Sequence, residues 1–333
     1  MDVRVSVAMV VYNATWCVER ALTSVLAQTR PAHEVLLCDD GSTDGTPELV
    51  ESRFGDAVRV LRLPHRNASA TRRIGTERAT GNWLAFVDAD DVWHPEKLER
   101  QVRFLERHPE VRWMGTDGRL VSAEGVLRES WLSDYFDPVR DLAGDLRPLL
   151  VERCFTLMSS MLMERDAYFE VGGLDPEIVY SHDYDLWLRL AARYPGGILA
   201  ERLIDYWTGP GTLSRHFEAR DRDDLLIMRK VEQGRMGRMP WLQRKGAERA
   251  AALEFELGLM ALRSGRIAEA RDHFRRAARR GPWRRRALSL GAAMLPTRLF
   301  TRLMRSPWAK GTVQRVRRTP KRMTLAGTPE AGT

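Results

Sequence analysis

Three carboxylates follow a short apolar segment in the first third of the chain. Asp88, Asp90 and Asp91 lie within four positions, directly after Trp83–Val87, whose length and composition predict a buried strand. Carboxylates this close repel one another unless a cation or hydrogen-bond donors share the site. A hard divalent metal ion bound to a phosphate-bearing substrate would supply the positive charge. The alternative from these residues alone is an acidic loop that caps the helix expected from Pro95.

Two more predicted strands end in polar residues. Arg4–Val11 is followed by Tyr12, and Glu34–Cys38 is followed by Asp39 and Asp40. Strands that alternate with helices predict right-handed βαβ units and a parallel sheet, in which the carboxyl ends of the strands meet at one edge. Ligands of open α/β folds bind at that edge. No glycine-rich phosphate-binding motif follows the first strand. We therefore expect the carboxylates to hold a metal ion that binds the phosphate.

The remaining pattern predicts further elements, less clearly after residue 110. We expect helices at Trp16–Gln28, Pro47–Arg53, Ala68–Ala79 and Pro95–Arg107, and strands at Val58–Leu63, Trp113–Thr116, Thr156–Glu164 and Leu203–Tyr206. The segment Ser130–Arg147 predicts only a loop.

An ordered set of segments across residues 3–215 resembles the family 2 glycosyltransferases. The set comprises Val5–Asn13, Leu22–Gln28, Asp39–Thr46, Asn67–Gly75, Phe86–Leu98, Val171–Asp175 and Asp183–Leu190. The resemblance implies an α/β GT-A fold, Rossmann-like with a mostly parallel sheet. It also implies a nucleotide-sugar donor, a Mg²⁺ or Mn²⁺ cofactor and inversion at the anomeric carbon.

The same resemblance implies roles for individual donor-site residues. Tyr12 and Asp40 correspond to positions that contact the nucleobase and ribose. Asp88 lies nearer the ribose, and Asp90 is the expected metal ligand. Arg72 stands in the place of an arginine near the base, with a solvated helix arginine as the alternative.

Two neighbouring aspartates are interpreted as structural. Asp39 is expected to hold the backbone of the Ser42-Thr43 turn. Asp91 is expected to support the metal ligand indirectly or to cap the next helix.

A second carboxylate site begins the predicted helix near residue 186. Inverting transfer needs a base that takes a proton from the acceptor hydroxyl, and the resemblance assigns this role to Asp183, with a helix cap as the alternative. His182 replaces a family glutamate and is expected either to orient Asp183 or to be a tolerated surface residue. Trp207 replaces a family arginine. Arg215 and His216, together with His182, are therefore the candidates for contacts with the diphosphate or the acceptor.

Charge divides the chain into two regions. Positions 228–333 contain 26 basic and 7 acidic residues, a net charge of +19. The remaining positions have a net charge of −11, which gives the whole chain +8. We expect a catalytic domain at 1–227, a basic helical extension at 228–320 and a disordered tail at 321–333. Near 251–284, residues at tetratricopeptide offsets predict one helical hairpin that needs a packing partner. These residues are Leu257, Gly258, Ala270, Phe274, Ala277 and Pro282.

The composition favours a globular protein of a reducing compartment. It has 44% hydrophobic residues and three widely spaced cysteines, and no segment predicts a signal peptide or a membrane-spanning helix. We expect a cytoplasmic protein. The basic extension suggests peripheral contact with the anionic inner face of the cytoplasmic membrane, and genome-wide arginine bias or a body-packed helix explains it equally. Nucleic acid is a weaker expectation, because no recognised RNA-binding module is present.

These observations predict an inverting, metal-dependent glycosyltransferase. It would move a sugar from a nucleotide-diphosphate donor to an acceptor hydroxyl on a cell-surface glycan or a lipid-linked saccharide. The alternative is a catalytically degenerate nucleotide-sugar-binding or scaffold protein, motivated by the replacements at His182 and Trp207. The sequence indicates neither the sugar nor the oligomeric state.

Overall fold

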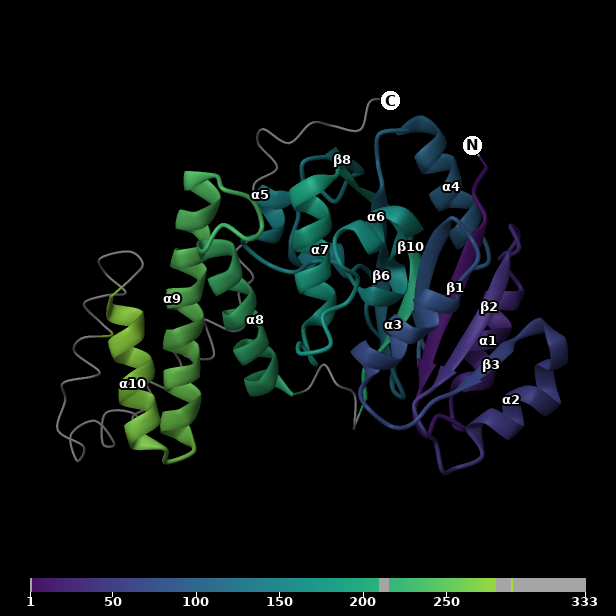
Figure 1. Ribbon diagram of the computed structural model, residues 1–333, viewed down its shortest axis with the longest axis horizontal. Helices are drawn as coiled ribbons and strands as arrows, with labels where there is room; N and C mark the ends of the chain where they lie inside the picture. Colours follow the sequence, from purple (N-terminus) through teal and green to yellow (C-terminus); the bar gives the residue numbers. More distant parts are fainter. Residues whose placement is uncertain (1, 210–215, 280–288, 290–333) are drawn as a thin grey trace. The chain divides into compact units, whose positions relative to one another are not determined.

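The computed structural model describes residues 2–209, 216–279 and 289 (Figure 1). The described residues form two compact units. The first comprises residues up to Leu150 and the described residues from Cys154 to 209; the second comprises Val151–Arg153 and the described residues from 216 on. Helix α8 (Phe217–Glu232) belongs to the second unit and runs without a break across the boundary predicted after residue 227.

The first unit is built on a ten-stranded sheet (Figure 1). The strand order is β3-β2-β1-β4-β9-β6-β10-β5, with β7 paired to β6 and β8 paired to β10. The first four of these strands are mutually parallel, and β9 lies antiparallel between β4 and β6. This arrangement confirms the predicted α/β class with a mostly parallel sheet. The strands are β1 (Val5–Val11), β2 (Glu34–Asp39), β3 (Arg59–Arg62), β4 (Trp83–Asp88), β5 (Val92–Trp93), β6 (Trp113–Ser122), β7 (Gly125–Arg128), β8 (Leu142–Gly144), β9 (Leu162–Glu164) and β10 (Gly196–Trp207).

Helices pack on both faces of this sheet. Side chains of α1 (Val18–Leu26), α2 (Thr46–Phe54) and α4 (Lys97–Arg107) form one core with alternate residues of β1, β2 and β4. On the opposite face, Phe86 of β4 contacts Tyr168 of α6 (Arg165–Glu170), and Trp113 of β6 stacks on Trp187 of α7 (His182–Arg193). Burial on both faces explains why the central strands read as continuous apolar runs.

A close approach fixes α3 (Ala68–Arg78) on this second face. A Cβ atom at Gly75 would lie 2.3 Å from the Sγ atom of Cys38 on β2. Only glycine therefore allows the helix backbone to come this near the strand. The contact matters for the site because α3 carries Arg72 three residues earlier.

The structure corrects several predicted elements beyond residue 110. The apolar run Thr156–Glu164 is a 3₁₀ turn at Met158–Ser160 followed by the short strand β9, and not one continuous strand. Within this turn, the Ser159 side chain accepts a hydrogen bond from the N–H of Asp88, 2.9 Å away. Strand β10 also begins at Gly196, earlier than the predicted Leu203.

The predicted loop between residues 130 and 147 has short elements of its own. These are a 3₁₀ turn at Leu132–Asp134, strand β8 and the first residue of α5 (Arg147–Leu150). The loop is held by the buried carboxylate of Asp117, which accepts hydrogen bonds from the Leu132 N–H at 2.9 Å and the Ser130 hydroxyl at 2.6 Å.

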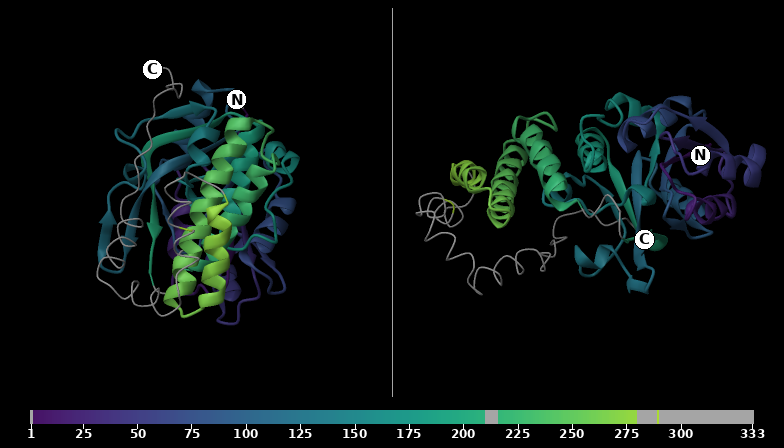
Figure 2. Two further views of the ribbon diagram at one scale, coloured as in Figure 1. Left: turned by 90° about the vertical axis from the view of Figure 1, so that its left-hand side faces the viewer. Right: turned by 90° about the horizontal axis from the view of Figure 1, so that it is seen from below.

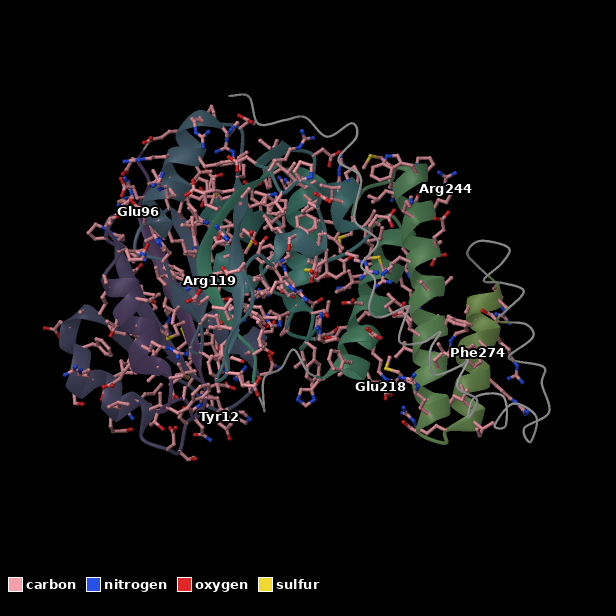
Figure 3. All side chains as sticks on the ribbon, turned by 180° about the vertical axis from the view of Figure 1, so that it is seen from behind. Tyr12, Glu96, Arg119, Glu218, Arg244 and Phe274 are labelled. Atoms are coloured by element: carbon pink, nitrogen blue, oxygen red, sulfur yellow. The ribbon has the colours of Figure 1, made fainter. Side chains whose placement is uncertain are left out.

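The described part of the second unit contains three long helices, α8, α9 (Pro240–Arg263) and α10 (Ile267–Ala278) (Figure 2). Helices α9 and α10 form the expected hairpin. The ring of Phe274 on α10 packs directly on Gly258 of α9, where an added Cβ atom would lie 2.9 Å from the ring (Figure 3). Helix α8 packs along α9 and is the partner that the hairpin requires. That the hairpin is a tetratricopeptide repeat stays a prediction.

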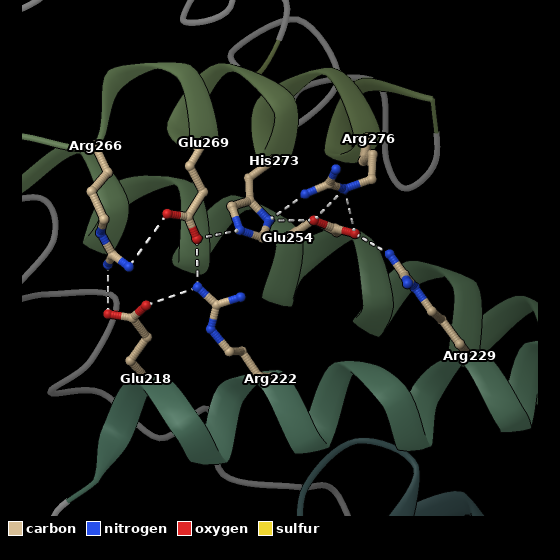
Figure 4. A network of polar contacts seen from close by, with 8 residues as sticks. All are labelled: Glu218, Arg222, Arg229, Glu254, Arg266, Glu269, His273 and Arg276. Atoms are coloured by element: carbon tan, nitrogen blue, oxygen red, sulfur yellow. Dashed lines mark hydrogen bonds and ion pairs between the residues drawn. The ribbon is translucent and has the colours of Figure 1, made fainter.

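A polar network joins these three helices (Figure 4). The buried carboxylate of Glu254 on α9 contacts Arg229 of α8 at 2.5 Å and Arg276 of α10 at 3.0 Å. It also contacts the buried imidazole of His273 at 2.6 Å. A buried carboxylate surrounded by donors from two other helices fixes their positions along one another.

The other predictions for the C-terminal region concern residues outside the described part of the chain. These are Pro282, the basic segment after residue 288 and the tail at 321–333. Within the described ranges, each helix is too short or too polar to span a bilayer.

Candidate active site

The ends of β1 and β2 bring an aromatic side chain and a carboxylate into one corner of the sheet. Tyr12 follows β1 and is half exposed (Figure 3). Its ring stacks on that of His65, with ring centroids 4.4 Å apart. His65 Nδ1 lies 3.0 Å from Oδ2 of Asp40, which follows β2. Asp40 is buried and also accepts hydrogen bonds from the Arg66 N–H at 3.0 Å and the Thr71 hydroxyl. An exposed aromatic face beside a fixed carboxylate can receive a flat, hydrogen-bonding base.

The neighbouring carboxylate, Asp39, shapes the turn after β2. Both of its oxygens lie 3.2 Å from the Ser42 N–H. The Thr43 N–H donates instead to Oδ1 of Asn13 at 2.8 Å. Asp39 therefore holds the Ser42 end of the turn as predicted, and Asn13 connects the turn to the end of β1.

The carboxylates after β4 are joined to the start of α7 through Arg72. Its Nη2 donates to Oδ1 of Asp88 at 2.6 Å, and its Nη1 lies 2.8 Å from Nε2 of His182. The Arg72 side chain is 3% exposed, so the alternative of a solvated helix arginine is wrong. A planar guanidinium with donors on both edges suits such a bridge between two separate elements.

His182 is buried and has a defined proton position. Its Nδ1 lies 2.9 Å from the carbonyl oxygen of Val179, which can only accept a hydrogen bond. Its Nε2 faces Arg72, which can only donate. Both contacts are satisfied by the neutral imidazole with its proton on Nδ1. The surface alternative for His182 is therefore wrong, and the residue contacts the arginine that also holds Asp88.

Asp90 has the environment of a cation ligand. Burial and the charge of Asp88 raise its pKa to about 6. Within the described residues, no other side chain donates a hydrogen bond to its carboxylate or forms an ion pair with it. The described residues also contain no cluster of three or more metal-ligating side chains. Asp90 thus fits a divalent ion whose other ligands come from substrate oxygens and water, which is how Mg²⁺ is commonly held.

Asp91 has a structural role. It is fully buried, accepts a hydrogen bond from the Ser159 hydroxyl, and accepts another from the N–H of Trp207 at 2.8 Å. Burial and the charges of Asp88 and Asp90 raise its pKa well above the usual range. Asp91 therefore ties the loop after β4 to the 3₁₀ turn and to the end of β10, and it does not cap α4.

Asp183 and Asp185 lie in the first turn of α7 and differ in environment. Asp183 is partly exposed, and its Oδ1 accepts a hydrogen bond from the N–H of Tyr184 at 2.7 Å. Asp185 is fully buried and lies 2.7 Å from Nε and Nη2 of Arg189, whose Nη1 reaches the carbonyl of Val171 at 2.5 Å. The accessible carboxylate is thus Asp183, whereas Asp185 anchors the helix to the turn after α6.

The last two predicted contacts lie beyond β10. Arg215 is outside the described residues, and His216 is an exposed residue of the second unit that precedes α8. The sequence analysis missed His65, Ser159 and Arg20 as neighbours of the site. No local motif indicates them, since each reaches the sheet edge only through the packing of distant segments.

Part of the chain is similar in sequence to known glycosyltransferases. Residues 6–159 match the model of Glycosyl transferase family 2. An uncharacterised glycosyltransferase of Rickettsia felis is 32% identical over 214 residues, which is 63% of this chain and 34% of that protein. TuaG of Bacillus subtilis, a glycosyltransferase provisionally named for teichuronic acid biosynthesis, is 38% identical over 104 residues, 30% of this chain and 41% of that protein. The matched part thus spans well under half of these relatives' length.

Solved structures share the fold at low sequence identity. TarS 1–349 of S. aureus, crystallised with UDP-GlcNAc, has a TM-score of 0.66 and 17% identity over 92% of both chains. The mannosyltransferase PcManGT of Pyrobaculum calidifontis, in complex with GDP-Man and Mn²⁺, has a TM-score of 0.57 and 19% identity over 95% of this chain and 87% of that one. Residues 6–159 are therefore a glycosyl transferase family 2 domain, and the first unit has the GT-A fold.

Proposed function

We propose that this protein is an inverting, metal-dependent glycosyltransferase that uses a nucleotide-diphosphate sugar. The observation that carries the proposal is the bridge from Asp88 through Arg72 to His182, the residue beside Asp183. It holds the carboxylates at the end of β4 and the accessible carboxylate of α7 in one assembly. A transfer reaction needs these two functions together, one at the leaving group and one at the acceptor.

In this proposal the donor nucleotide lies along the carboxyl edge of β2, β1 and β4. The base stacks near Tyr12 and hydrogen-bonds to Asp40, and the ribose lies near Asp88. The exposed face of Tyr12 and the fixed carboxylate of Asp40 support this placement. The solved neighbours were obtained with UDP-GlcNAc and with GDP-Man, so a nucleotide-sugar donor is the substrate class expected here.

Asp90 would hold a Mg²⁺ or Mn²⁺ ion at the donor diphosphate. When bound, this ion stabilises the negative charge of the departing nucleoside diphosphate. The raised pKa of Asp90 supports the assignment, because a bound cation offsets both the burial and the repulsion from Asp88 that raise it.

Asp183 would act as the general base. The acceptor oxygen forms a bond to the anomeric carbon while the bond from that carbon to the diphosphate oxygen breaks, and the acceptor proton moves to the Asp183 carboxylate. Single-step attack from the opposite side inverts the anomeric centre. Asp183 is the candidate because it is accessible at the start of a helix that the Arg72 bridge holds in place.

We propose an acceptor from cell-surface glycan synthesis, either a growing glycan or a lipid-linked saccharide. The similarity to TuaG supports this class. The enzyme would act in the cytoplasm, with the basic C-terminal region at the inner face of the membrane.

The experiment is a thermal-shift panel of UDP, GDP, dTDP, CDP and ADP, each with and without Mn²⁺. At about 100 times its dissociation constant, one nucleotide should raise the unfolding free energy by about 2.7 kcal/mol. We expect this for one base, only with metal, in the wild type and not in Asp90→Ala. Release of that nucleoside diphosphate from its sugar conjugate would then identify the donor.

The same panel tests the scaffold alternative. Binding of the donor with Mn²⁺, without transfer or hydrolysis of the sugar, would support a catalytically degenerate protein. A panel without any stabilisation would contradict both.

A further inference from the structure

An arginine of α1, Arg20, lies beside the proposed metal ligand. Nη2 of Arg20 donates to the backbone carbonyl of Asp90 at 3.0 Å. Its guanidinium carbon lies 5.3 Å from the ring centroid of Trp207, at the end of β10. Two segments distant in sequence thus hold one cation next to the proposed metal site.

Arg20 is free to take an anionic ligand. In the part of the chain that the structure describes, no carboxylate lies within ion-pair distance of its guanidinium. The side chain is exposed, and among the described residues only one of its five N–H donors has a protein acceptor. Arg72, the other guanidinium near the end of β4, is buried and already paired with Asp88.

Trp207 positions Arg20. The guanidinium faces the indole, an arrangement whose attraction is about 0.5–1 kcal/mol at exposed sites. Trp207 is fixed in turn by its backbone N–H, which donates to the buried Asp91 at 2.8 Å. Trp16, which is 64% exposed, packs against the same indole with centroids 6.0 Å apart. The arginine is therefore pre-oriented without a carboxylate that would neutralise it.

The negative charge expected at this edge of the sheet favours an additional cationic side chain. A nucleoside diphosphate brings at least two negative charges to a site that already contains Asp90, and one divalent ion does not neutralise all of them. Arg20 already contacts this site, because its Nη2 donates to the backbone carbonyl of Asp90. Arginine is also the side chain best suited to bind phosphate oxygens through two parallel hydrogen bonds.

We propose that Arg20, positioned by Trp207, binds the donor diphosphate and stabilises the leaving nucleoside diphosphate. The inference rests on the proposed function and names a further residue of the same site. It also accounts for Trp207, an uncharged residue whose ring orients the guanidinium of Arg20.

The test is the affinity of the nucleoside diphosphate selected by the thermal-shift panel, measured by calorimetry with Mn²⁺, together with that of the matching nucleoside. Arg20→Gln should weaken diphosphate binding about 10-fold to 100-fold, the range of a hydrogen bond to a charged group, and leave nucleoside binding unchanged. Trp207→Ala should weaken diphosphate binding by a smaller factor, and Arg20→Lys should retain part of it.

Arg30→Gln is the matched control. Nη2 of Arg30 also donates to a backbone carbonyl, that of Val3 at 3.1 Å, but at the opposite end of the parallel strands β1 and β4. Its diphosphate affinity should equal that of the wild type.

The outcomes separate the two proposals. Wild-type diphosphate affinity in Arg20→Gln would overturn the inference and leave the proposed function intact. Equal losses of diphosphate and nucleoside binding in Arg20→Gln, or an equal loss in Arg30→Gln, would overturn it as well. A wild type that binds no nucleoside diphosphate would overturn both.

Discussion

Arg72 lies between Asp88 and His182 and is hydrogen-bonded to both, at 2.6 Å and 2.8 Å. The three residues come from α3, β4 and α7, which are separated by up to 110 positions in the chain. Arg72 and His182 are both buried, so the contact between them is shielded from water, whereas the side chain of Asp88 is 34% exposed. This connection couples the donor edge of the sheet to the helix that carries Asp183.

Replacing Arg72 by Met should therefore damage both stability and donor binding. Removing one partner of a hydrogen-bonded buried group costs about 1–3 kcal/mol, and here both Asp88 and His182 lose their donor. Denaturant unfolding measures the stability, and Mn²⁺-dependent nucleotide binding measures the site. Arg78→Met is the control on the same helix, because Arg78 is exposed; it should change stability by no more than about 0.5 kcal/mol. Equal effects of the two variants would contradict the bridge.

Asp183 and Asp185 should separate catalysis from stability. Asp183→Asn should retain the fold and donor affinity and lose transfer to the acceptor, because the amide cannot accept the acceptor proton. Asp185→Asn should lower stability by about 1–3 kcal/mol, since it leaves the buried end of Arg189 without its carboxylate. Unfolding curves and product formation are measured for both. Full turnover in Asp183→Asn would show that another group is the base.

The pH dependence of metal binding should follow Asp90. Its folded pKa of about 6 lies above the ordinary value for aspartate. In the metal-free protein, the stability that this group contributes is therefore largest below about pH 4 and is lost as the pH rises through 6. Mn²⁺ needs the ionised form, so the Mn²⁺-dependent thermal shift with nucleotide should be large at pH 7 and fall through pH 6. In Asp90→Asn the shift should be absent at every pH.

Gly75 should be intolerant of a side chain because of Cys38. Alanine would place its Cβ 2.3 Å from the buried Sγ, and overpacking of this kind costs about 1–3 kcal/mol. Gly75→Ala should lower the unfolding free energy by that amount, and adding Cys38→Ala should restore much of it by removing the sulfur atom. If the double variant were less stable than Gly75→Ala, the close approach would not be the cause.

Acid should weaken the helical unit through Glu254. Burial acts to raise its pKa, but hydrogen bonds from His273 and Arg276 outweigh it and hold the pKa below the ordinary value. The resulting stability is present above the unfolded pKa of about 4.3 and is lost as the pH falls through the lower folded value. Glu254→Gln should therefore destabilise the unit at pH 7 by about 1–3 kcal/mol and remove this acid sensitivity. Glu248→Gln, on the same helix, is the control, and circular dichroism follows the helices.

The sequence by itself determined the βαβ order of the first unit and the edge at which its polar residues meet. This was possible because burial on both faces makes strands β1, β2 and β4 uniformly apolar, and because parallel strands end on the same side. The resemblance then indicated a role for each carboxylate, and the structure places Asp40, Asp88 and Asp90 at that edge.

Only the tertiary structure decided how these residues are partnered. Nothing local distinguishes a solvated arginine from Arg72, or a surface histidine from His182; their burial depends on how α3, β4 and α7 pack. The same holds for Ser159, which lies in a 3₁₀ turn within an apolar run and accepts a hydrogen bond from the N–H of the distant Asp88. Hydrogen bonds between segments tens of residues apart leave no periodicity in the sequence, so they appear only when the chain is folded.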